Sequence, residues 1–568
     1  MRNWAELQTA KITQTGTKAA ITVDTGGNVS ALTVSGGTTV SIIDRAAAGG
    51  DKLSSVSLAG YTSTATIQSD ALTSLSLANS NQNVTITAAA GPRTLDLTVN
   101  GMTGGMTTDS TATAVTLAAT GSASSNVKVT AASATSLTIT GDQSLSLSNV
   151  TLATNATITT TNTAGLTITG TLMPDIGFTG SDANESIVAT ATTRTMTLGK
   201  GDDSYEAAGA GIGTGGSVDG GEGTDTLVLR ALTAETVTAT TAFAAQARNF
   251  EVLLLKDSFA VGIDVNLANL NSGGANTITK VVASTSVVNQ PFTLNGLATG
   301  GTVEFRGANT AQTTINIIDA ATGSADVLNI AIANTLARNT NTLNVANVET
   351  INFLTDDTST SPTAIQHSST LAAAAASKIT VSGDAGLALT FSGTALTSFD
   401  ASGVTLGNVT WTTGALANSA TIKGGAGSDT LNAAAATASV TIEAGAGNDT
   451  ITGSSKADTI DAGEGNDTIT PGLGADTIDV GTGNDTVILT AANTNGTIFP
   501  SITGMNAGDK IQFISGTASF QSAAITAGGA PSYADLLDAA TNGAANRVVW
   551  FQFGGDTYLV QDRSANTT

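Results

Sequence analysis

The sequence predicts an all-β fold, with elongated, solenoid-like domains of short strands and segments of parallel β-roll. Three observations support this prediction. Small residues and aliphatic residues dominate, whereas aromatic residues make up 4% and charged residues 11% of the 568 positions. Short stretches alternate apolar residues with Thr or Ser, which is typical of strands with one buried face. Five aspartates recur at intervals of nine residues, which is typical of a β-roll.

The five aspartates lie in similar glycine-rich segments, which read GAGNDTI, GSSKADTI, GEGNDTI, GLGADTI and GTGNDTV. The glycines allow a tight turn at little steric cost. The aspartate closes the turn, and the apolar residue two positions later is expected to point inward from a short strand. A step of nine is half a coil, so alternate segments stack on the same side of the roll. The inward residues are Ile451, Ile460, Ile469, Ile478 and Val487.

Stacking of these turns predicts a calcium site. Calcium prefers about six to eight hard oxygen ligands, which stacked carboxylates and backbone carbonyls supply. Without an ion the aspartates would repel one another, so binding and folding should be one event. The unit GGAGSDTL at 424–431 starts the series. The predicted ligands are Gly425, Gly427, Asp429, Gly445, Gly447, Asp449, Asp458, Gly463, Gly465, Asp467, Gly472, Gly474, Asp476, Gly481, Gly483 and Asp485.

A second glycine–aspartate cluster lies upstream and contains Asp203 and Asp225. Glu185 occupies the aspartate position of a further unit, 18 residues before Asp203, which is one full coil. We predict calcium at Asp203 and Asp225. A turn without an ion is the alternative, because glycine and aspartate are common in ordinary turns.

Other acidic residues and the one histidine have simpler interpretations. Asp356 and Asp357 are predicted to lie in a solvated turn rather than a further ion site. Asp326 and Asp400 are predicted to cap strands or turns. His367 is the sole histidine and lies among polar residues that read as a loop. Zinc is not expected, because the chain has one histidine and no cysteine.

Composition and charge exclude several classes of function. The chain has 44 acidic and 21 basic residues, for a net charge of −23, and no basic stretch suited to nucleic acid. The absence of cysteine suits a bacterial protein exported without disulfide chemistry. No apolar run reaches the roughly 18–20 residues that span a bilayer, and no N-terminal secretory signal is evident. No metalloprotease or lipase motif is present, so we expect no enzyme.

The changes in pattern along the chain suggest five segments. Residues 1–174 are strand-rich, and periodicity leaves a solenoid and a sandwich open, with recurring rungs favouring a solenoid. Residues 175–230 hold the first glycine–aspartate cluster, 231–420 return to strands, and 421–489 form the β-roll. Residues 490–568 are predicted to be β-rich, with one short helix near Tyr533–Ala540 capped by Ser532. A hairpin is expected across Gly554 and Gly555.

These features together resemble RTX-type bacterial surface-layer (S-layer) proteins of the Caulobacter and Campylobacter kind. The resemblance rests on the nonapeptides and on the sequence segments NVETINF, FEVLLL, LTSFDASGV, AGDKIQF and WFQFGGDTYLVQD. It covers residues 175–568 well and 1–174 more loosely. It implies secretion through a type I channel, folding by extracellular calcium and self-assembly into a two-dimensional lattice on the bacterial cell surface. It also implies anchoring to lipopolysaccharide, although no helical anchoring domain is evident.

We therefore expect a calcium-dependent structural subunit of a surface layer. One alternative is a secreted RTX adhesin that binds a surface glycan and uses the same roll as a stalk. A secreted hydrolase with a calcium roll is a third class, which would need a catalytic domain in 1–174 or 231–420. The expected partners are copies of the same chain, with no nucleic acid and no membrane-spanning segment.

Overall fold

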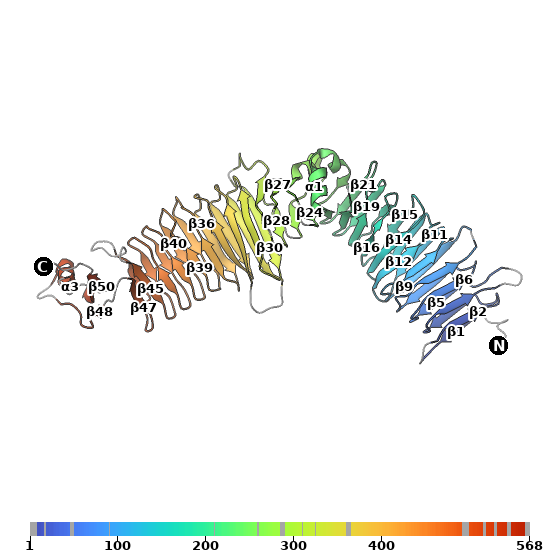
Figure 1. Ribbon diagram of the computed structural model, residues 1–568, viewed down its shortest axis with the longest axis horizontal. Coiled ribbons are helices and arrows are strands. Elements are labelled where there is room, and N and C mark those ends of the chain that lie inside the picture. Colours follow the sequence, from blue (N-terminus) through green and yellow to red (C-terminus); the bar gives the residue numbers. More distant parts are fainter. Residues whose placement is uncertain are drawn as a thin grey trace. The chain divides into compact units, whose positions relative to one another are not determined.

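The computed structural model describes residues 8–562, apart from 16–18, 46–49, 90, 210, 258–260, 285–289, 309–310, 324, 359–364, 491–498, 515–518, 527–530 and 542–546. These residues form two compact units, Met1–Ala298 (unit 1) and Thr299–Thr568 (unit 2). Each unit contains a parallel β-solenoid, in which consecutive strands go to different sheets and most strands pair with the strand two places along (Figure 1). This confirms the predicted all-β solenoid over the sandwich alternative.

In unit 1 the odd-numbered strands form one parallel sheet: β1 (Thr9–Thr13), β3 (Ala31–Ser35), β5 (Ser55–Ala59), β7 (Ser74–Ala78), β9 (Thr94–Asn100), β11 (Ala114–Ala119), β13 (Ser136–Gly141), β15 (Thr157–Thr160), β17 (Gly177–Thr179), β19 (Thr195–Lys200), β21 (Ser217–Glu222) and β23 (Ala247–Arg248). The even-numbered strands form the facing row: β2 (Ile21–Asp24), β4 (Val40–Ile43), β6 (Ala65–Gln68), β8 (Val84–Thr87), β10 (Met106–Asp109), β12 (Ser124–Thr130), β14 (Leu145–Thr151), β16 (Leu166–Leu172), β18 (Glu185–Ala189), β20 (Ser204–Ala207), β22 (Thr226–Leu229), β24 (Val252–Leu255) and β26 (Lys280–Ala283). A further parallel pair is β25 (Ile263–Asn266) and β27 (Phe292–Leu297).

Unit 2 repeats this arrangement. Its even-numbered row contains β28 (Thr302–Phe305), β30 (Val327–Asn334), β32 (Thr350–Asp357), β34 (Lys378–Gly383), β36 (Ser398–Val404), β38 (Ala420–Lys423), β40 (Val440–Glu443), β42 (Thr459–Asp461), β44 (Thr477–Asp479) and β46 (Ser501–Thr503). Its odd-numbered row contains β29 (Thr313–Ile317), β31 (Asn339–Val345), β33 (Gln366–Ala372), β35 (Gly386–Phe391), β37 (Val409–Thr412), β39 (Thr430–Asn432), β41 (Thr450–Thr452), β43 (Thr468–Thr470), β45 (Thr486–Thr490) and β47 (Lys510–Ile514).

The cores are ladders of inward apolar side chains, from one in the shortest strands to three in strands such as β9 and β30. The inward residues predicted from the nonapeptides are all buried: Ile451, Ile460, Ile469, Ile478 and Val487. They stack in register, so that Ile442 pairs with Ile460 and Ile460 with Ile478 across the even-numbered row. The core widens in the earlier coils, where the rings of Phe399 and Trp411 stack at 3.9 Å between centroids. The three-residue strands of the nonapeptide coils, β41 to β44, each bury one isoleucine, whereas aromatic side chains fill the core of longer coils.

The end of unit 2 confirms the predicted helix and hairpin. Helix α3 (Tyr533–Thr541) begins after Ser532, whose side chain accepts a hydrogen bond from the Asp535 N–H at 3.3 Å. The strands β49 (Arg547–Phe553) and β50 (Asp556–Asp562) pair antiparallel across Gly554 and Gly555. β48 (Ser519–Phe520) completes this sheet.

Several short helices between residues 231 and 274 were not expected, because this stretch was predicted to be strand-like. They are α1 (Ala231–Thr238), η1 (Thr241–Ala245), α2 (Leu267–Leu270) and η2 (Ser272–Gly274). α1 has two buried alanines and a weakly amphipathic sequence, so no 3.6-residue apolar period marked it. It follows β22 as a connection before β24, whose register with β22 is unbroken.

Candidate metal centre

The aspartates of the nonapeptides form two columns along unit 2, each residue lying immediately before a strand. We call Asp429, Asp449, Asp467, Asp485 and Asp509 the first aspartate column, because they precede strands of the odd-numbered row. Backbone hydrogen bonds link them in order. The Asp449 N–H donates to Asp467 Oδ1 at 2.7 Å, and the Asp467 N–H donates to Asp485 Oδ1 at 2.8 Å. The same bond joins each remaining pair of neighbours at 2.7 and 2.8 Å.

The second aspartate column, Asp458 and Asp476, lies on the other side of the coils, before strands of the even-numbered row. The Asp458 N–H donates to Asp476 Oδ1 at 2.9 Å, and the Val440 N–H donates to Asp458 Oδ1 at 2.8 Å. The predicted half-coil step of nine residues is therefore what separates the two columns. Each carboxylate holds the backbone of the coil before it through one oxygen.

The second carboxylate oxygen distinguishes the members of a column. Among the described residues, Oδ2 is buried without a hydrogen-bond partner in Asp449, Asp467, Asp476 and Asp485. In the first member of each column it is satisfied by the protein. The Gly425 N–H donates to Asp429 Oδ2 at 2.6 Å, and the Ser454 N–H donates to Asp458 Oδ2 at 2.6 Å. Each column thus begins with a carboxylate that protein donors cap and continues with carboxylates that have a free oxygen. The first column ends at Asp509, whose Oδ2 again accepts a protein hydrogen bond, from the Asn506 N–H.

This burial changes the proton affinity of the columns. Desolvation raises the pKa of Asp449 to about 7, although the Asp429 N–H opposes the rise. Desolvation likewise raises the pKa of Asp467 and of Asp476 to about 6. An unpartnered buried acceptor costs about 1–3 kcal/mol, and more when it is charged. The columns therefore need protons or cations to be stable.

Glycines place backbone carbonyl oxygens beside the carboxylates. Gly465 has φ +129°, and a Cβ there would lie 1.7 Å from the Gly447 carbonyl oxygen of the previous coil. Gly463 has φ +92°, and its Cβ would lie 1.9 Å from the Gly445 oxygen. Among the described residues no hydrogen bond reaches the Gly447 or Gly465 oxygen, so these oxygens are available as ligands. Similar close approaches with positive φ occur at Gly445, Gly447, Gly472, Gly474, Gly481 and Gly483.

Two of the predicted glycines differ from the others. Gly425 and Gly427 do not adopt positive φ. A Cβ at Gly427 would still lie 2.6 Å from the Gly407 carbonyl oxygen, and one at Gly425 would lie 2.9 Å from the Val404 oxygen. These glycines belong to the capped coil of Asp429. Close contact between coils, rather than left-handed backbone, explains their presence there.

A column of amide side chains accompanies the first aspartate column and was not predicted. The Asn466 N–H donates to Asn448 Oδ1 at 2.7 Å, and the Asn484 N–H donates to Asn466 Oδ1 at 2.8 Å. These bonds run toward the preceding coil, opposite in direction to those of the aspartates. The recurring asparagine in GAGND, GEGND and GTGND was the sequence signal. Each coil is thus fixed to both neighbours through its turn.

Unit 1 contains a comparable set, the unit 1 acid column, made of Glu185, Asp203, Asp225 and Glu251. The Asp203 N–H donates to Asp225 Oδ1 at 2.8 Å, and the Asp225 N–H donates to Glu251 Oε2 at 2.7 Å. Within the described part of unit 1, Oδ2 of Asp203 and of Asp225 is buried without a hydrogen-bond partner. Burial raises the pKa of Asp203 to about 7 and that of Asp225 to about 6.

The first member of the unit 1 acid column is capped as in unit 2. The Ser181 N–H donates to Glu185 Oε2 at 3.1 Å, and the Ser181 hydroxyl donates to Oε1 at 2.7 Å. A Cβ at Gly223 would lie 1.8 Å from the Gly201 carbonyl oxygen, which matches the nonapeptide turns. Glu251 was missed because α1 and η1 lengthen the interval to 26 residues, although it too lies immediately before a strand.

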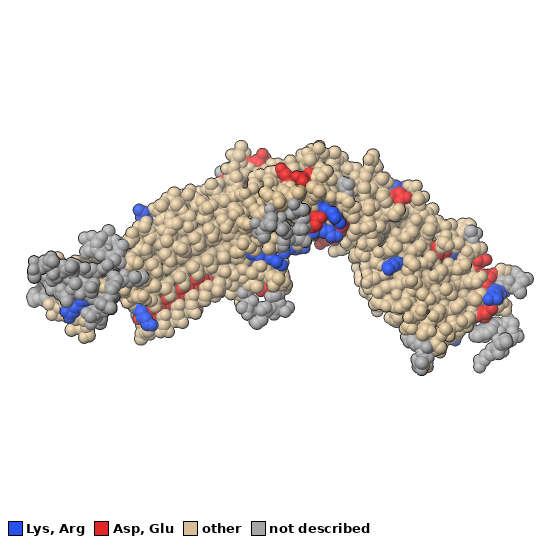
Figure 2. Space-filling model, viewed as in Figure 1, with Lys and Arg blue, Asp and Glu red and all other residues tan. Residues whose placement is uncertain are grey.

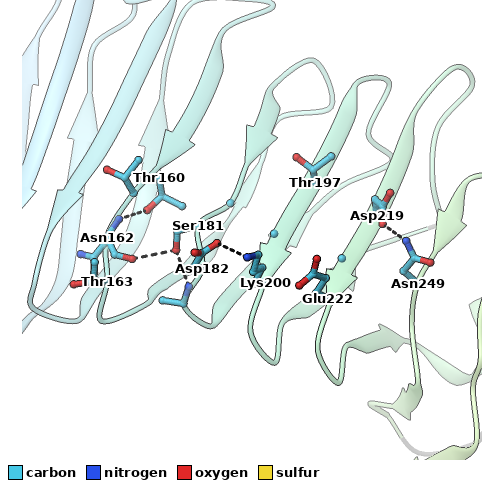
Figure 3. A pocket seen from close by; sticks show the side chains of 15 residues that line it. Thr160, Asn162, Thr163, Ser181, Asp182, Thr197, Lys200, Asp219, Glu222 and Asn249 are labelled. Carbon is cyan, nitrogen blue, oxygen red and sulfur yellow. Dashed lines mark hydrogen bonds and ion pairs between the residues drawn. The ribbon is translucent and has the colours of Figure 1, made fainter.

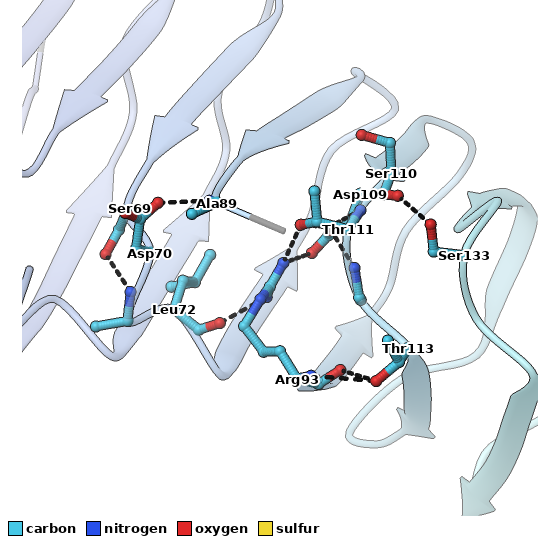
Figure 4. Close-up of polar contacts among 12 residues, drawn as sticks. Ser69, Asp70, Leu72, Ala89, Arg93, Asp109, Ser110, Thr111, Thr113 and Ser133 are labelled. Atoms are coloured by element: carbon cyan, nitrogen blue, oxygen red, sulfur yellow. Dashed lines mark hydrogen bonds and ion pairs between the residues drawn. The ribbon is translucent and has the colours of Figure 1, made fainter. Parts of the chain in front are cut away.

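Earlier coils of unit 1 show how a buried acid is satisfied without an ion. Asp109 is buried, and its carboxylate pairs with the Arg93 guanidinium, which also donates to the Leu72 carbonyl at 2.6 Å (Figure 4). The Thr111 and Ala112 N–H groups donate to Asp109 Oδ1 at 3.0 Å each. Here the protein itself supplies the positive charge. Among the described residues, the free Oδ2 atoms of the columns have no arginine or lysine beside them. This contrast with Asp109 fits a cation from outside the chain.

A hollow of about 830 Å³ lies on unit 1 beside the unit 1 acid column (Figure 3). Successive coils contribute Asn162, Asp182, Lys200 and Glu222 to its lining. Lys200 Nζ lies 4.0 Å from Asp182 Oδ1 in an exposed ion pair. The hollow is therefore lined by hydroxyl, amide and charged groups without an aromatic side chain.

Exposed charge has a separate pattern. Figure 2 shows a surface that is mostly uncharged, with a narrow row of acidic side chains that crosses successive coils of unit 2. Among exposed residues, Glu443, Asp461 and Asp479 are register neighbours on β40, β42 and β44. Burial, followed by repulsion from Asp479 and Glu443, raises the pKa of Asp461. Lys423 Nζ pairs with Glu443 at 2.6 Å.

The structure corrects three expectations about other polar residues. His367 is fully buried in β33, not in a polar loop, because His367, Ser369 and Leu371 alternate inward. The Arg338 N–H donates to its Nδ1 at 3.1 Å, and desolvation lowers the pKa of His367. Asp356 and Asp357 end strand β32 rather than forming a solvated turn, and Asp357 is buried.

Comparison with known families identifies the repeats. The family profile of the RTX calcium-binding nonapeptide repeat matches residues 419–436, 443–478 and 452–487. No curated protein matches this chain. The matched residues include both aspartate columns up to Asp485, whereas the unit 1 acid column lies outside them. The chain therefore carries calcium-binding RTX repeats, which indicate a secreted, extracellular protein of the RTX type.

The donor set fits calcium. Carboxylates, glycine carbonyls and water are the hard oxygens that calcium prefers. No group of three or more Asp, Glu, His or Cys side chains that could hold a metal by themselves occurs in the described part of the chain. Backbone oxygens must therefore complete each site, which agrees with the glycine turns. None of the helices in the described residues is long and apolar enough to cross a membrane.

Proposed function

We propose that the chain is a structural subunit of a calcium-dependent two-dimensional bacterial surface layer, with no catalytic role. The observation that supports it most is the set of buried, unpartnered carboxylate oxygens repeated coil after coil in a parallel β-solenoid. Calcium at these oxygens would lock successive coils into a rigid rod. The resemblance of several strand phrases to S-layer proteins supports the lattice role.

At residue level, the ions are assigned to the carboxylates with a free oxygen. These are Asp449, Asp467, Asp476 and Asp485 in unit 2, and Asp203 and Asp225 in unit 1. The carbonyls of the glycine turns complete the coordination. Asp429 and Asp458 open their columns and already accept protein hydrogen bonds through both oxygens. They act mainly as caps, which leaves them fewer lone pairs for an ion.

When bound, calcium supplies the positive charge that balances the carboxylates of the columns. The side chains of this chain have the other roles. They hold each backbone turn through Oδ1, exclude water from Oδ2, and keep like charges one coil apart, at about 4.8 Å. Before export, low cytosolic calcium leaves these coils unfolded enough for a type I secretion channel. Outside the cell, calcium binding and coil formation occur together.

Lattice formation follows from the same chemistry in this proposal. The exposed row of Glu443, Asp461 and Asp479 repels itself and favours calcium bridges to a neighbouring copy. Many weak bridges hold a lattice through multivalency. Anchoring to lipopolysaccharide is part of the proposal on the strength of the resemblance.

The test is assembly of the purified full chain, followed by negative-stain electron microscopy. We expect ordered two-dimensional sheets in millimolar calcium, which dissolve on chelation and re-form when calcium returns. Sheets that persist unchanged in excess chelator would contradict calcium-driven assembly. Substitution of the exposed row (Asp461→Asn with Asp479→Asn) should weaken the sheets and leave coil folding intact, as measured by circular dichroism.

An RTX adhesin that binds a surface glycan is the second candidate, and the hollow on unit 1 favours it. Its amide, hydroxyl and carboxylate groups, including Asn162, Asp219 and Glu222, suit a polyhydroxylated chain. A glycan array with the full chain in calcium would test this role. Specific binding that Glu222→Gln abolishes, with only scattered particles in the microscope, would favour the adhesin over the lattice subunit.

A further inference from the structure

A buried acid outside both the nonapeptides and the unit 1 acid column has the same unusual environment. Asp326 lies immediately before β30 in unit 2, about a hundred residues upstream of the matched repeats. From the sequence, Asp326 is predicted to cap a strand or a turn. Its side chain is 8% exposed, and its Oδ2 is buried without a hydrogen-bond partner in the described residues.

The next coil places a second carboxylate against it. The Asp326 N–H donates to Glu349 Oε2 at 2.9 Å, and the Thr350 N–H donates to the Asp326 carbonyl oxygen at 3.0 Å. Val327 and Thr350 are register partners on β30 and β32. Glu349 is partly exposed. Two acids thus lie at the equivalent turn position of adjacent coils, and Glu349 is the one that reaches solvent.

The pair of Asp225 and Glu251 in unit 1 has the same arrangement. There the aspartate N–H donates to the glutamate Oε2 of the next coil at 2.7 Å, and the aspartate Oδ2 is likewise unpartnered. In both pairs a glycine backbone lies against the free oxygen. A Cβ would lie 2.1 Å from Asp326 Oδ2 if added at Gly323, and 2.6 Å from Asp225 Oδ2 if added at Gly220.

An acid that protein donors cap has a hydrogen bond on both carboxylate oxygens, unlike Asp326. In Asp458 the Ser454 N–H and hydroxyl supply donors at 2.6 and 2.8 Å, so both oxygens are satisfied. Asp109 is satisfied by Arg93. Among the described residues, Asp326 has neither kind of donor on Oδ2, although leaving a buried acceptor unpaired is costly. A cation from solution would supply the partner that these residues do not.

We propose that Asp326 and Glu349 hold a hard divalent cation of the calcium class, at a site separate from the RTX repeats. Asp326 Oδ2 and the Glu349 carboxylate supply two negative charges, and backbone carbonyls and water complete the shell. With only two carboxylates on a partly exposed turn, the site belongs with extracellular calcium modules of about 10⁻⁴–10⁻³ M affinity. It fixes the β30 and β32 coils together. The proposal stands or fails independently of the columns.

The direct test is anomalous diffraction from crystals of the full chain grown in calcium and soaked in terbium. We expect a peak within coordination distance of both Asp326 Oδ2 and Glu349. The aspartate columns are internal controls for the soak. Peaks at the columns with none at Asp326, or a water or proton on Oδ2 in a well-resolved map, would overturn the site. Peaks at Asp326 with none in the columns would instead contradict the proposed function and leave this site standing.

Bound-calcium counts in solution give a second readout. After equilibrium dialysis at several millimolar calcium, Glu349→Gln should bind one ion fewer per chain than the unaltered protein. Asp326→Asn should do the same. The matched control is Asp400→Asn, which changes an acid in the same unit whose Oδ1 accepts from the Ser402 N–H at 3.1 Å. Equal counts in Glu349→Gln and the control would overturn the proposal, and the diffraction test needs no variant to fold.

Discussion

The two oxygens of a single aspartate do different work in this protein. In Asp467, Oδ1 accepts the N–H of the preceding coil at 2.7 Å, while Oδ2 is buried without a partner. In Asp458 both oxygens are satisfied by the protein. This difference separates residues that need an ion from residues that cap a column.

Substitution of Asp467 by asparagine should have opposite effects in the two states. It removes a buried charge, so the calcium-free coils become more stable. It also removes a ligand, so we expect the calcium-bound form to lose about 1–3 kcal/mol, the usual cost of deleting one partner of a buried polar group. Thermal unfolding with and without calcium measures both effects.

Asp458→Asn is the matched comparison. Its new amide would face the Ser454 N–H, a donor against a donor, so stability should fall by a similar amount with and without calcium. If Asp467→Asn and Asp458→Asn showed the same calcium dependence, the distinction between free and capped oxygens would be wrong.

The raised pKa values predict how the calcium-free protein responds to pH. Burial raises the pKa of Asp449 to about 7 and of Asp467 to about 6, above the value of about 3.9 in an unfolded chain. Protonation therefore stabilises the calcium-free fold fully below about pH 4, and this contribution is lost as pH rises through 6 to 7.

We expect the calcium-free protein to unfold at a lower temperature at pH 8 than at pH 5, as followed by circular dichroism. Saturating calcium should reverse this order, because calcium competes with the protons on the same oxygens. The double variant Asp449→Asn with Asp467→Asn should show a weaker pH dependence. A calcium-free protein that became more stable between pH 5 and pH 8 would contradict the burial of these carboxyls.

At the scale of the coil, two devices close the turns. Nonapeptide coils use glycine carbonyls and acids with a free oxygen, whereas earlier coils of unit 1 use an internal cation, Arg93, on Asp109. The glycines are required by both conformation and space. The two kinds of turn should therefore differ in whether their stability depends on calcium.

Gly465→Ala should disrupt the β-roll. Gly465 has φ +129°, and the new Cβ would lie 1.7 Å from the Gly447 carbonyl oxygen. Gly209 is the matched control, since it has φ +127° and nothing within 4 Å of an added Cβ. Gly209→Ala carries only the backbone strain, about 1–2 kcal/mol. Calcium titrations followed by circular dichroism should show lost cooperativity for Gly465→Ala alone; equal effects would show that space between coils is not limiting.

Arg93→Met should destabilise unit 1 by an amount that calcium does not change. It leaves Asp109 buried without its cation, and breaking a buried pair in this way costs about 3–5 kcal/mol. Unfolding measured in calcium and in chelator should show the same loss. Rescue by calcium would mean that this coil also accepts an ion, contrary to its complete set of protein donors.

At the scale of the whole molecule, the sequence predicted most of the architecture because its period is visible in the residues. A nine-residue step places Asp449 and Asp467 one coil apart, and alternating Thr and apolar residues face outward and inward. Glu251 and Asp509 escaped prediction because insertions lengthen their intervals to 26 and 24 residues. Only the folded register shows that they continue a column.

Other features were not read from the sequence. The caps on Asp429 and Asp458 use donors from Gly425 and Ser454, four residues earlier in each case, a local contact that the nonapeptide pattern does not mark. His367 is a polar residue, yet it shares the inward face of its alternating strand with Ser369 and Leu371. The helices near residue 231 consist of alanine- and threonine-rich sequence without a helical period. The burial of His367 and the helices near residue 231 are tertiary outcomes rather than sequence signals.

The central claim is that calcium completes the aspartate columns, and hydrogen exchange on the full chain tests it most directly. With calcium, backbone amides throughout residues 440–487 should be strongly protected. In chelator at pH 8 that protection should disappear, while β5 to β15 of unit 1, whose buried acid Asp109 pairs with Arg93, stay protected. Equal protection of residues 440–487 in both conditions would contradict the account.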